Sequence, residues 1–222
     1  PLYSSAASDV YKRQLQDQVL EIISEVETPF YLTGGTALSR GYLNHRFSDD
    51  LDFFVNDDSS FNLYVDRAIN RLTSESALKL AVVTRAERYA QLAIEKGTIF
   101  LKLEFVNDVP SHIGAIVNHP VLGRLDSAEN ILANKVTAVL SREEPKDLAD
   151  IWGICTKLTL SLNQAITDAE SKAAGIFPAD LARVLLSAAK SDWEVINWID
   201  APRVKIFVDD LHRLGEDLIV LK

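Results

Sequence analysis

Two neighbouring stretches carry residues whose types and spacing suit phosphate chemistry. The first runs from Tyr31 to Leu38 and reads YLTGGTAL, and the second runs from Arg46 to Val55 and reads RFSDDLDFFV. Together they predict a strand, a glycine turn, a short helix, and a second strand that carries carboxylates two residues apart. This order is typical of a phosphate-binding turn beside a metal site.

Asp50 and Asp52 are the candidate metal ligands. Side chains alternate along a strand, so both carboxylates project from one face, roughly 6–7 Å apart given two rises of about 3.3 Å. Such a pair suits Mg²⁺, which takes a few carboxylate oxygens and completes its shell with water and substrate phosphates. Without a cation, like charges at about 4 Å repel by roughly 4 kcal/mol. The alternative is a solvated strand start that Arg46 neutralises, but the apolar neighbours favour the metal site.

The glycine turn is the candidate nucleotide-binding element. Gly34 and Gly35 let the backbone turn sharply and approach a ligand, and the helix expected from Thr36 would present free N–H groups to phosphate. We therefore expect Gly34, Gly35 and Thr36 to hold triphosphate oxygens. Arg46, as a forked donor, and Ser48, through its hydroxyl, are expected to contact phosphate, or else to cap the turn. A plain turn is the competing interpretation.

These motifs and two later segments resemble the AbiEii/MenT-type nucleotidyltransferases, a branch of the DNA polymerase beta-like superfamily. Residues 100–105 (FLKLEF) resemble the family strand that supplies a third carboxylate. Residues 131–142 (ILANKVTAVLSR) and 146–150 (KDLAD) resemble the Lys and Asp helices of the family. The resemblance spans about residues 29 to 155.

The resemblance adds three candidate catalytic residues. Glu104 would be the third metal ligand or a base, although the family more often has Asp there and an ion pair with Lys102 is the alternative. Lys135 would neutralise the leaving pyrophosphate, or would only extend its amine to water. Asp147 would orient Lys135 or a metal-bound water, or would only place charge at a helix N-terminus.

The activity implied by the resemblance is transfer of a nucleoside monophosphate (NMP) from a triphosphate (NTP) to an acceptor. Two Mg²⁺ ions, or Mn²⁺, would be held by Asp50, Asp52 and Glu104. The acceptor would be RNA, notably the 3′ end of tRNA, and the protein would be a toxin or phage-defence component with a cognate antitoxin. Two alternatives stay open: a small-molecule or protein acceptor, and a non-catalytic binding module on the same fold.

Composition sets further expectations. The 222 residues are 47% hydrophobic and include one cysteine, Cys155, expected to pack as a small hydrophobe. No apolar run is long enough for a membrane span and no signal peptide is evident, so a cytoplasmic location is expected. The net charge of −9 argues against nucleic-acid binding through overall charge, but leaves room for a local basic lane. Its candidate residues are Arg40, Arg46, Lys102, Lys135, Arg142 and Lys146.

The positioning elements predict an α+β fold: a polymerase-beta-like mixed sheet with flanking helices, followed by a helical C-terminal lobe. Residues 15–125 are the expected α/β lobe and 126–222 the helical lobe, with 1–14 a non-native or disordered lead. In the α/β lobe we expect helices near 15–28 and 61–72 and strands at 78–84, 89–94, 98–106 and 112–117. A capping box at 126–129 opens the helical lobe, with helices to 140 and near 146–158, 161–174, 178–190 and 201–221. The four histidines are expected at the surface or in loops. The three tryptophans are expected in the core or at a contact between the lobes, with stacking on a base as the alternative.

Overall fold

The computed structural model describes the backbone of residues 2–219 and the side chains of residues 8–219. The chain forms two compact units. Unit 1 comprises residues 1–37, 48–110 and 116–126, and unit 2 comprises residues 38–47, 111–115 and 127–222. Unit 1 ends at Asp126, and the segments 38–47 and 111–115 belong to unit 2, so the units are not continuous in sequence; the division into lobes at residue 125 stays a prediction.

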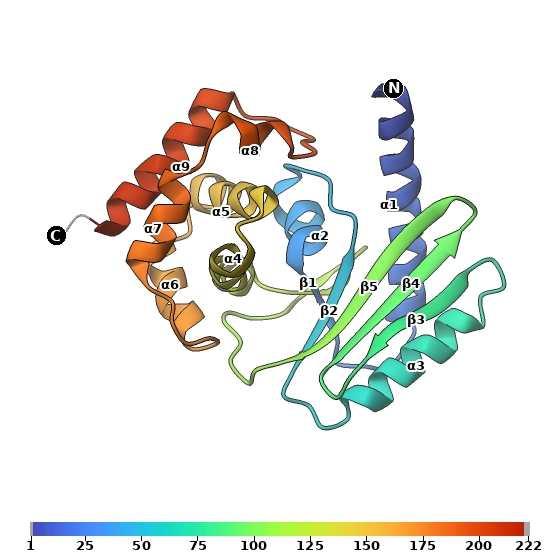
Figure 1. Cartoon of the computed structure of the whole chain (residues 1–222). Helices are drawn as coiled ribbons and strands as arrows, with labels where there is room; N and C mark the ends of the chain where they lie inside the picture. Colours follow the sequence, from blue (N-terminus) through green and yellow to red (C-terminus); the bar gives the residue numbers. More distant parts are fainter. Residues whose placement is uncertain (1, 220–222) are drawn as a thin grey trace. The chain divides into compact units, whose positions relative to one another are not determined.

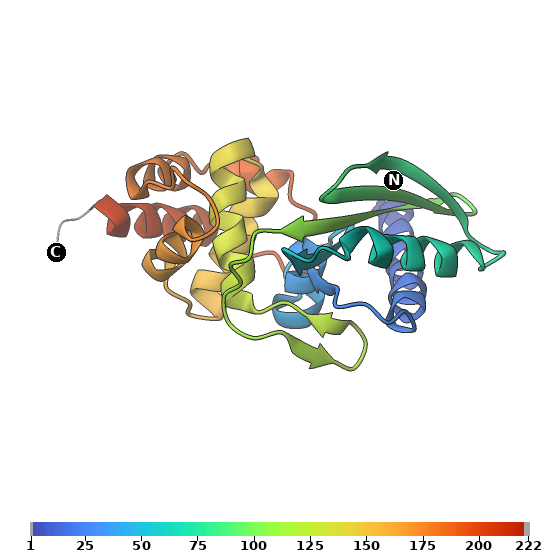
Figure 2. The same cartoon turned by 90° about the horizontal axis from the view of Figure 1, so that it is seen from below.

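Unit 1 contains a seven-stranded mixed sheet with the strand order β3-β4-β5-β2-β1-β7-β6. The strands are β1 (Tyr31–Thr33), β2 (Leu51–Asn56), β3 (Lys79–Arg85), β4 (Tyr89–Lys96), β5 (Ile99–Asp108), β6 (Val117–His119) and β7 (Gly123–Leu125). The pairs β2–β5 and β1–β7 are parallel, and the other pairs are antiparallel. Helices α1 (Leu2–Ser24) and α3 (Phe61–Thr73) cover one face of this sheet (Figures 1 and 2).

Alternating burial along β2 and β5 separates the two faces of the sheet. Leu51, Phe53 and Val55 are buried, while the residues between them are half-buried, and β5 follows the same period. The rings of Phe53 and Phe105 stack with their centroids 5.3 Å apart. One face of the sheet therefore forms the apolar core with α1 and α3, and the other face presents the polar residues.

Unit 2 is helical. Its helices are α4 (Ala128–Arg142), α5 (Pro145–Lys157), α6 (Leu162–Glu170), α7 (Pro178–Leu186), α8 (Lys190–Glu194) and α9 (Val204–Ile219). Helix α4 packs against α5, α6 and α7, and a π-helical turn, η1 (Ser39–Leu43), packs against α5. Trp152, Trp198 and Phe207 pack edge to face, which confirms the expected core position of Trp152.

Most elements with strong periodicity are confirmed, whereas short or irregular ones differ. The expected strand at 112–117 is wrong, because residues 111–116 are irregular and the short hairpin β6–β7 follows instead. The expected irregular lead is helical from Leu2, and Pro1 lies outside the described residues. Helix α4 is capped by Ser127, which accepts from the Asn130 amide, while Asp126 accepts from Thr33 instead. The end of the helix expected to run to 221 also lies outside the described residues.

Candidate active site

In unit 1 the acidic strand lies directly beside the glycine turn. Antiparallel pairing of β1 with β2 sets Thr33 opposite Asp52, and the chain then turns at Gly34, whose φ is +68°. A Cβ built on Gly34 would overlap Oδ2 of Asp52. The Asp52 carboxylate therefore occupies the space that any other side chain at position 34 would need. Glycine permits this close approach of a side chain to the backbone, whereas the approach to a ligand expected for the turn stays a prediction.

Thr36 ties the turn to the start of the acidic strand. Helix α2 (Gly34–Leu38) begins at Gly34, two residues earlier than expected, and Thr36 is fully buried. Its hydroxyl donates a hydrogen bond to the carbonyl oxygen of Asp50. The Thr36 side chain therefore fixes the backbone that carries Asp50, and the expected role of Thr36 in holding triphosphate oxygens stays a prediction.

Glu104 is the neighbour of Asp52 in the sheet. The parallel register of β2 and β5 pairs these two residues, and their carboxylates interact. Tyr89 donates a 2.6 Å hydrogen bond from its hydroxyl to Oε1 of Glu104. Tyr89 was not predicted from the sequence as a site residue, because its contact with Glu104 depends on the register of β4 and β5. Burial and this contact with Glu104 raise the pKa of Tyr89 to about 12, so its hydroxyl stays a donor at neutral pH.

Lys102 supplies the positive charge among these carboxylates. Its Nζ lies 3.0 Å from Oδ2 of Asp50 and 3.4 Å from Oε1 of Glu104. Burial alone raises the pKa of Glu104, but the Tyr89 hydrogen bond and the Lys102 ammonium outweigh it and the net shift is downward. Burial alone lowers the pKa of Lys102, but Asp50 and Glu104 reverse the shift. Glu104 is therefore a carboxylate and Lys102 an ammonium at neutral pH.

The unit 1 carboxylates do not form a ready-made metal cage. Across the described residues, no set of three or more Asp, Glu, His and Cys side chains is arranged so that it would hold a metal ion by itself. The expected ligands Asp50, Asp52 and Glu104 are nevertheless brought together, with the Lys102 ammonium bound to two of them. We call these four residues, with Gly34, the carboxylate site.

Arg46 takes a different role from the one expected. Its Nε and Nη2 donate to the two carboxylate oxygens of Asp150, both at 2.7 Å, and its Nη1 donates to the carbonyl oxygen of Phe47. Arg46 is 4% exposed and Asp150 is fully buried. The forked guanidinium thus binds a buried carboxylate of unit 2.

Lys135 and Asp147 extend this buried charge network. Nζ of Lys135 lies 2.7 Å from Oδ1 of Asp147 and 2.6 Å from Oδ2 of Asp150, and Arg142 binds Asp147 from the other side. The expected orientation of Lys135 by Asp147 is therefore present. Burial alone raises the pKa of Asp150, but Arg46 and Lys135 outweigh it and hold that pKa well below its usual value. We use the name unit 2 charge network for the following six residues: His45, Arg46, Lys135, Arg142, Asp147 and Asp150.

His45 lies in the irregular segment that follows η1, as expected for a loop residue, but it is buried. Its ring is fully buried and its Nε2 lies 2.9 Å from Oδ1 of Asp150. Burial lowers the pKa of His45 despite the opposing effect of Asp150, so the neutral ring donates from Nε2. Among the described residues, Nδ1 has no hydrogen-bond partner.

The expected basic lane is largely neutralised within the fold. Lys102, Arg46, Lys135 and Arg142 bind the carboxylates described above, and Lys146 binds Glu144 at 2.8 Å. Ser48 belongs to unit 1, where its carbonyl oxygen accepts a hydrogen bond from Gln16. These contacts give most of the candidate cations a structural partner.

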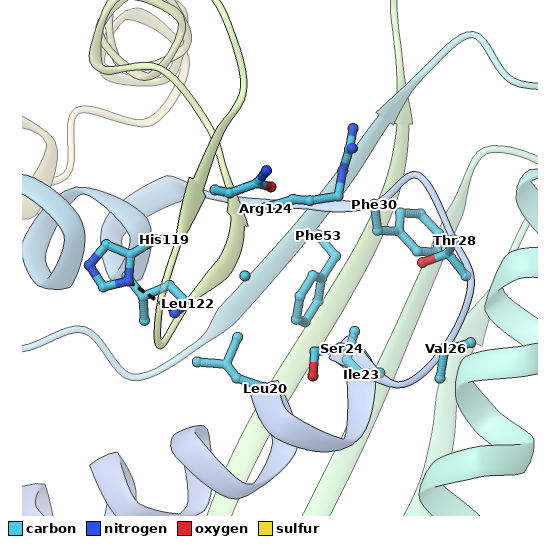
Figure 3. Close-up of a pocket in the computed structure, with 12 residues that line it drawn as sticks. Leu20, Ile23, Ser24, Val26, Thr28, Phe30, Phe53, His119, Leu122 and Arg124 are labelled. Carbon is cyan, nitrogen blue, oxygen red and sulfur yellow. Dashed lines mark hydrogen bonds between the residues drawn. The ribbon is translucent and has the colours of Figure 1, made fainter.

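A cavity of about 200 Å³ in unit 1 (Figure 3) has none of the three candidate carboxylates among its lining residues. It is lined mainly by apolar residues of α1 and of the sheet face opposite Asp52, with Phe53 among them. His119 and Arg124 of the β6–β7 hairpin also line it. Because it contains no carboxylate, we do not assign the candidate chemistry to this cavity.

A family model described as "Nucleotidyl transferase AbiEii toxin, Type IV TA system" matches residues 18–195. The chain belongs to the AbiEii nucleotidyl transferase toxin family. This match covers the glycine turn, the acidic strand and the Lys135 and Asp147 helices, and it confirms the resemblance found in the sequence. An uncharacterized protein of Aquifex aeolicus (strain VF5), aq_aa25, is 27% identical over 154 residues, which are 66% of this chain and 68% of that protein.

Solved structures with similar folds include proteins of two bacteria. MenT4, a nucleotidyltransferase toxin of Mycobacterium tuberculosis H37Rv, has a TM-score of 0.64 at 16% identity, covering 97% of this chain and 85% of MenT4. JHP933 from Helicobacter pylori gives 0.62 at 19% identity, with 95% and 91% coverage. A putative nucleotidyltransferase from H. pylori gives 0.61 at 20% identity, with 94% and 93% coverage. The AbiEii-family chain therefore shares the fold of these proteins.

None of the helices in residues 2–219 combines the length and apolarity that crossing a membrane requires.

Proposed function

We propose that the protein is an NTP-dependent nucleotidyltransferase whose active centre is the carboxylate site of unit 1. The observation that carries this proposal is the meeting of Asp50, Asp52 and Glu104 with the glycine turn, in a chain of the AbiEii nucleotidyl transferase toxin family. The missing side chain at Gly34 brings the carboxylates against the glycine turn, so that metal counterions and the triphosphate that they would bind lie next to one another.

The residues of the carboxylate site fit Mg²⁺, with Mn²⁺ as an alternative. The donors are carboxylate oxygens, which hard divalent cations prefer, and Lys102 shows that a cation is already accommodated between Asp50 and Glu104. Asp50, Asp52 and Glu104 would hold two ions. When bound, such ions neutralise phosphate charge and favour in-line attack of an acceptor hydroxyl.

The protein's own groups position this centre. Thr36 fixes the Asp50 backbone, Tyr89 holds one oxygen of Glu104, and the missing side chain at Gly34 leaves Asp52 its place. Gly35 would contribute backbone N–H groups to the triphosphate with Gly34. These contacts pre-organise the carboxylates before any ligand arrives.

In unit 2, we retain Lys135 and Asp147 as proposed contributors to catalysis. Two of the three N–H donors of Lys135 bind Asp147 and Asp150. The third donor is the group that we propose neutralises charge on the leaving pyrophosphate. Arg46 is proposed to act through Asp150, which it shares with Lys135.

For the acceptor we propose RNA, specifically the 3′ end of tRNA, as the family resemblance implies. The biological setting would be growth arrest or phage defence, with a cognate antitoxin as partner, because the family model describes type IV toxin–antitoxin systems.

The direct test uses NTPs labelled on either the α- or the γ-phosphate, with Mg²⁺ and bulk tRNA. Transfer of an NMP places α-label on the RNA and leaves γ-label in pyrophosphate. Asp52→Asn should abolish this transfer, whereas Asp49→Asn should retain it, because the Asp49 side chain is 63% exposed and pairs with Lys12, which is not part of the carboxylate site. Absence of α-label from every acceptor with all four NTPs would contradict the proposal.

A small molecule or a protein side chain is a second candidate acceptor. Two observations favour it: the net charge is −9, and most of the cations expected to form a basic lane bind carboxylates of the protein itself. A steep loss of acceptor binding with added salt would favour RNA, since released counterions drive nucleic-acid binding. Transfer to a protein or metabolite fraction with no transfer to RNA would establish the second candidate.

A further inference from the structure

The ammonium of Lys102 lies where a divalent cation would compete for the same oxygens. Its Nζ is 3.0 Å from Oδ2 of Asp50 and 3.4 Å from Oε1 of Glu104. Asp52 adjoins Glu104 in the sheet, so the ammonium contacts two carboxylates and a third lies beside one of them. In the absence of metal, this single positive charge offsets their mutual repulsion.

A metal ion and the ammonium exclude one another at this position. Mg²⁺ binds carboxylate oxygens at about 2.0–2.1 Å in a near-octahedral shell. An oxygen in such a shell has its charge directed to the metal, and a second cation next to it is repelled. Metal binding through Oδ2 of Asp50 and Oε1 of Glu104, the two oxygens that the ammonium contacts, therefore requires the Lys102 ammonium to move.

The Lys102 side chain can leave its carboxylate partners for solvent, whereas the Lys135 side chain is held in place. The Lys102 side chain is 37% exposed and extends from β5 on four flexible carbons, so its ammonium can reach water by rotamer change. The Lys135 side chain is only 8% exposed and is bound between two fully buried carboxylates. The two lysines thus play different parts, one exchangeable and one fixed.

Building on the nucleotidyltransferase function proposed above, we propose that Lys102 is a displaceable internal cation that holds the carboxylate site in its metal-free form and competes with the catalytic metal. Before the metal binds, the Lys102 ammonium keeps Asp50 and Glu104 in place. Because the metal must displace this ammonium, its affinity is lower than it would be for the same carboxylates without Lys102. Metal occupancy then depends on the divalent ion concentration and on any ligand that binds the displaced ammonium. Lys102 is a positioning residue in this scheme.

The experiment measures Mn²⁺ affinity by electron paramagnetic resonance of the free ion, using the full chain without nucleotide. Lys102→Met keeps the length of the side chain and removes its charge, so Mn²⁺ should bind about tenfold more tightly. Lys102→Arg keeps the charge and should stay within about threefold of the wild type. Lys96→Met, on the same β4–β5 hairpin but bound to Gln18, is the matched control and should leave the affinity unchanged.

A second readout is thermal stability with and without metal. Lys102→Met should lower the melting temperature of the metal-free protein, because three carboxylates lose their counter-charge, and saturating Mn²⁺ should restore it. Equal or weaker Mn²⁺ binding by Lys102→Met overturns the exchange, and so does the absence of measurable binding by both proteins.

The outcome also separates this inference from the proposed function. Tighter Mn²⁺ binding by Lys102→Met without NMP transfer by the wild type would leave the exchange standing and remove the proposed reaction. If the wild type transfers NMP but Lys102→Met binds Mn²⁺ with the same affinity as the wild type, the proposed reaction is supported and the proposed competition between Lys102 and the metal is refuted.

Discussion

The carboxylate of Asp52 lies against the backbone of Gly34, in the space where a Cβ would stand. This contact joins the two motifs that carry the candidate chemistry, because Gly34 opens the turn and Asp52 belongs to the acidic strand. Thr36 makes a second link by donating to the carbonyl oxygen of Asp50. The proposed metal-binding and phosphate-binding halves of the site are therefore joined by two direct contacts within unit 1.

Gly34→Ala should disable the carboxylate site. The substitution places a methyl group on Asp52 and forces alanine to a φ of +68°, so we expect a loss of about 3 kcal/mol in unfolding free energy and loss of NMP transfer. Gly97→Ala is the control: its φ is +62° but no atom lies within 4 Å of the added Cβ. That variant should lose only about 1 kcal/mol and keep its activity. Urea unfolding and the labelled-NTP assay measure both effects, and equal behaviour of the two variants would contradict the role of the Gly34–Asp52 contact.

Tyr89→Phe should weaken transfer without unfolding the protein. The variant removes the 2.6 Å hydrogen bond to Glu104 and leaves that carboxylate free to rotate, so we expect about tenfold slower transfer and about 1 kcal/mol lower stability. Tyr64→Phe removes a long, 3.4 Å hydroxyl contact to Asp58 and is the control. Unchanged transfer by Tyr89→Phe would show that Glu104 needs no positioning.

Asp150→Asn should destabilise unit 2 strongly. Asp150 is the shared carboxylate of Arg46, Lys135 and His45, and its neutralisation leaves buried cations without compensation. We expect a loss of about 3–5 kcal/mol in unfolding free energy. Asp209→Asn, which breaks an exposed pair with Lys205, should cost less than about 1 kcal/mol. Chemical denaturation of both variants tests the difference, and similar small losses would contradict a structural role for the unit 2 charge network.

His45 should make folding stability fall with acid. Burial lowers its pKa in the folded protein, although Asp150 opposes the shift, so the unfolded chain takes up the proton first. The stability that neutral His45 provides is present above the unfolded pKa of about 6.5 and is lost as the pH falls towards the folded pKa. The unfolding free energy of the wild type should therefore decrease from pH 8 to pH 5. His45→Gln, which keeps a donor for Asp150, should show a smaller decrease, and an equal decrease would refute this assignment.

The sequence was sufficient to predict the parts of the site that depend on local pattern. The alternating pattern along residues 51–56 places Asp52 and Phe53 on opposite faces of the sheet, and the paired glycines mark the turn. The acidic face and the turn could therefore be identified without coordinates. The neighbourhood of Asp52 and Glu104 followed only from resemblance, because the parallel register of β2 and β5 joins residues 52 apart in the chain.

Contacts that depend on long-range register could not be predicted. Tyr89 reaches Glu104 through the β4–β5 pairing, and Arg46 meets Asp150 across 104 residues of sequence. From the sequence alone, Arg46 precedes an acidic strand and was therefore assigned to nearby anions. Its partner in the structure is Asp150 of α5. The burial of His45 against Asp150 was not foreseen for the same reason, since no periodic signal marks the loop that contains it.

The most direct test of the central claim is anomalous diffraction from crystals grown with Mn²⁺ and a non-hydrolysable NTP analogue. The account predicts manganese peaks about 2.2 Å from the carboxylate oxygens of Asp50 and Asp52, with the triphosphate beside Gly34 and Gly35. Manganese and nucleotide bound elsewhere, with Lys102 still on Asp50 and Glu104, would contradict it.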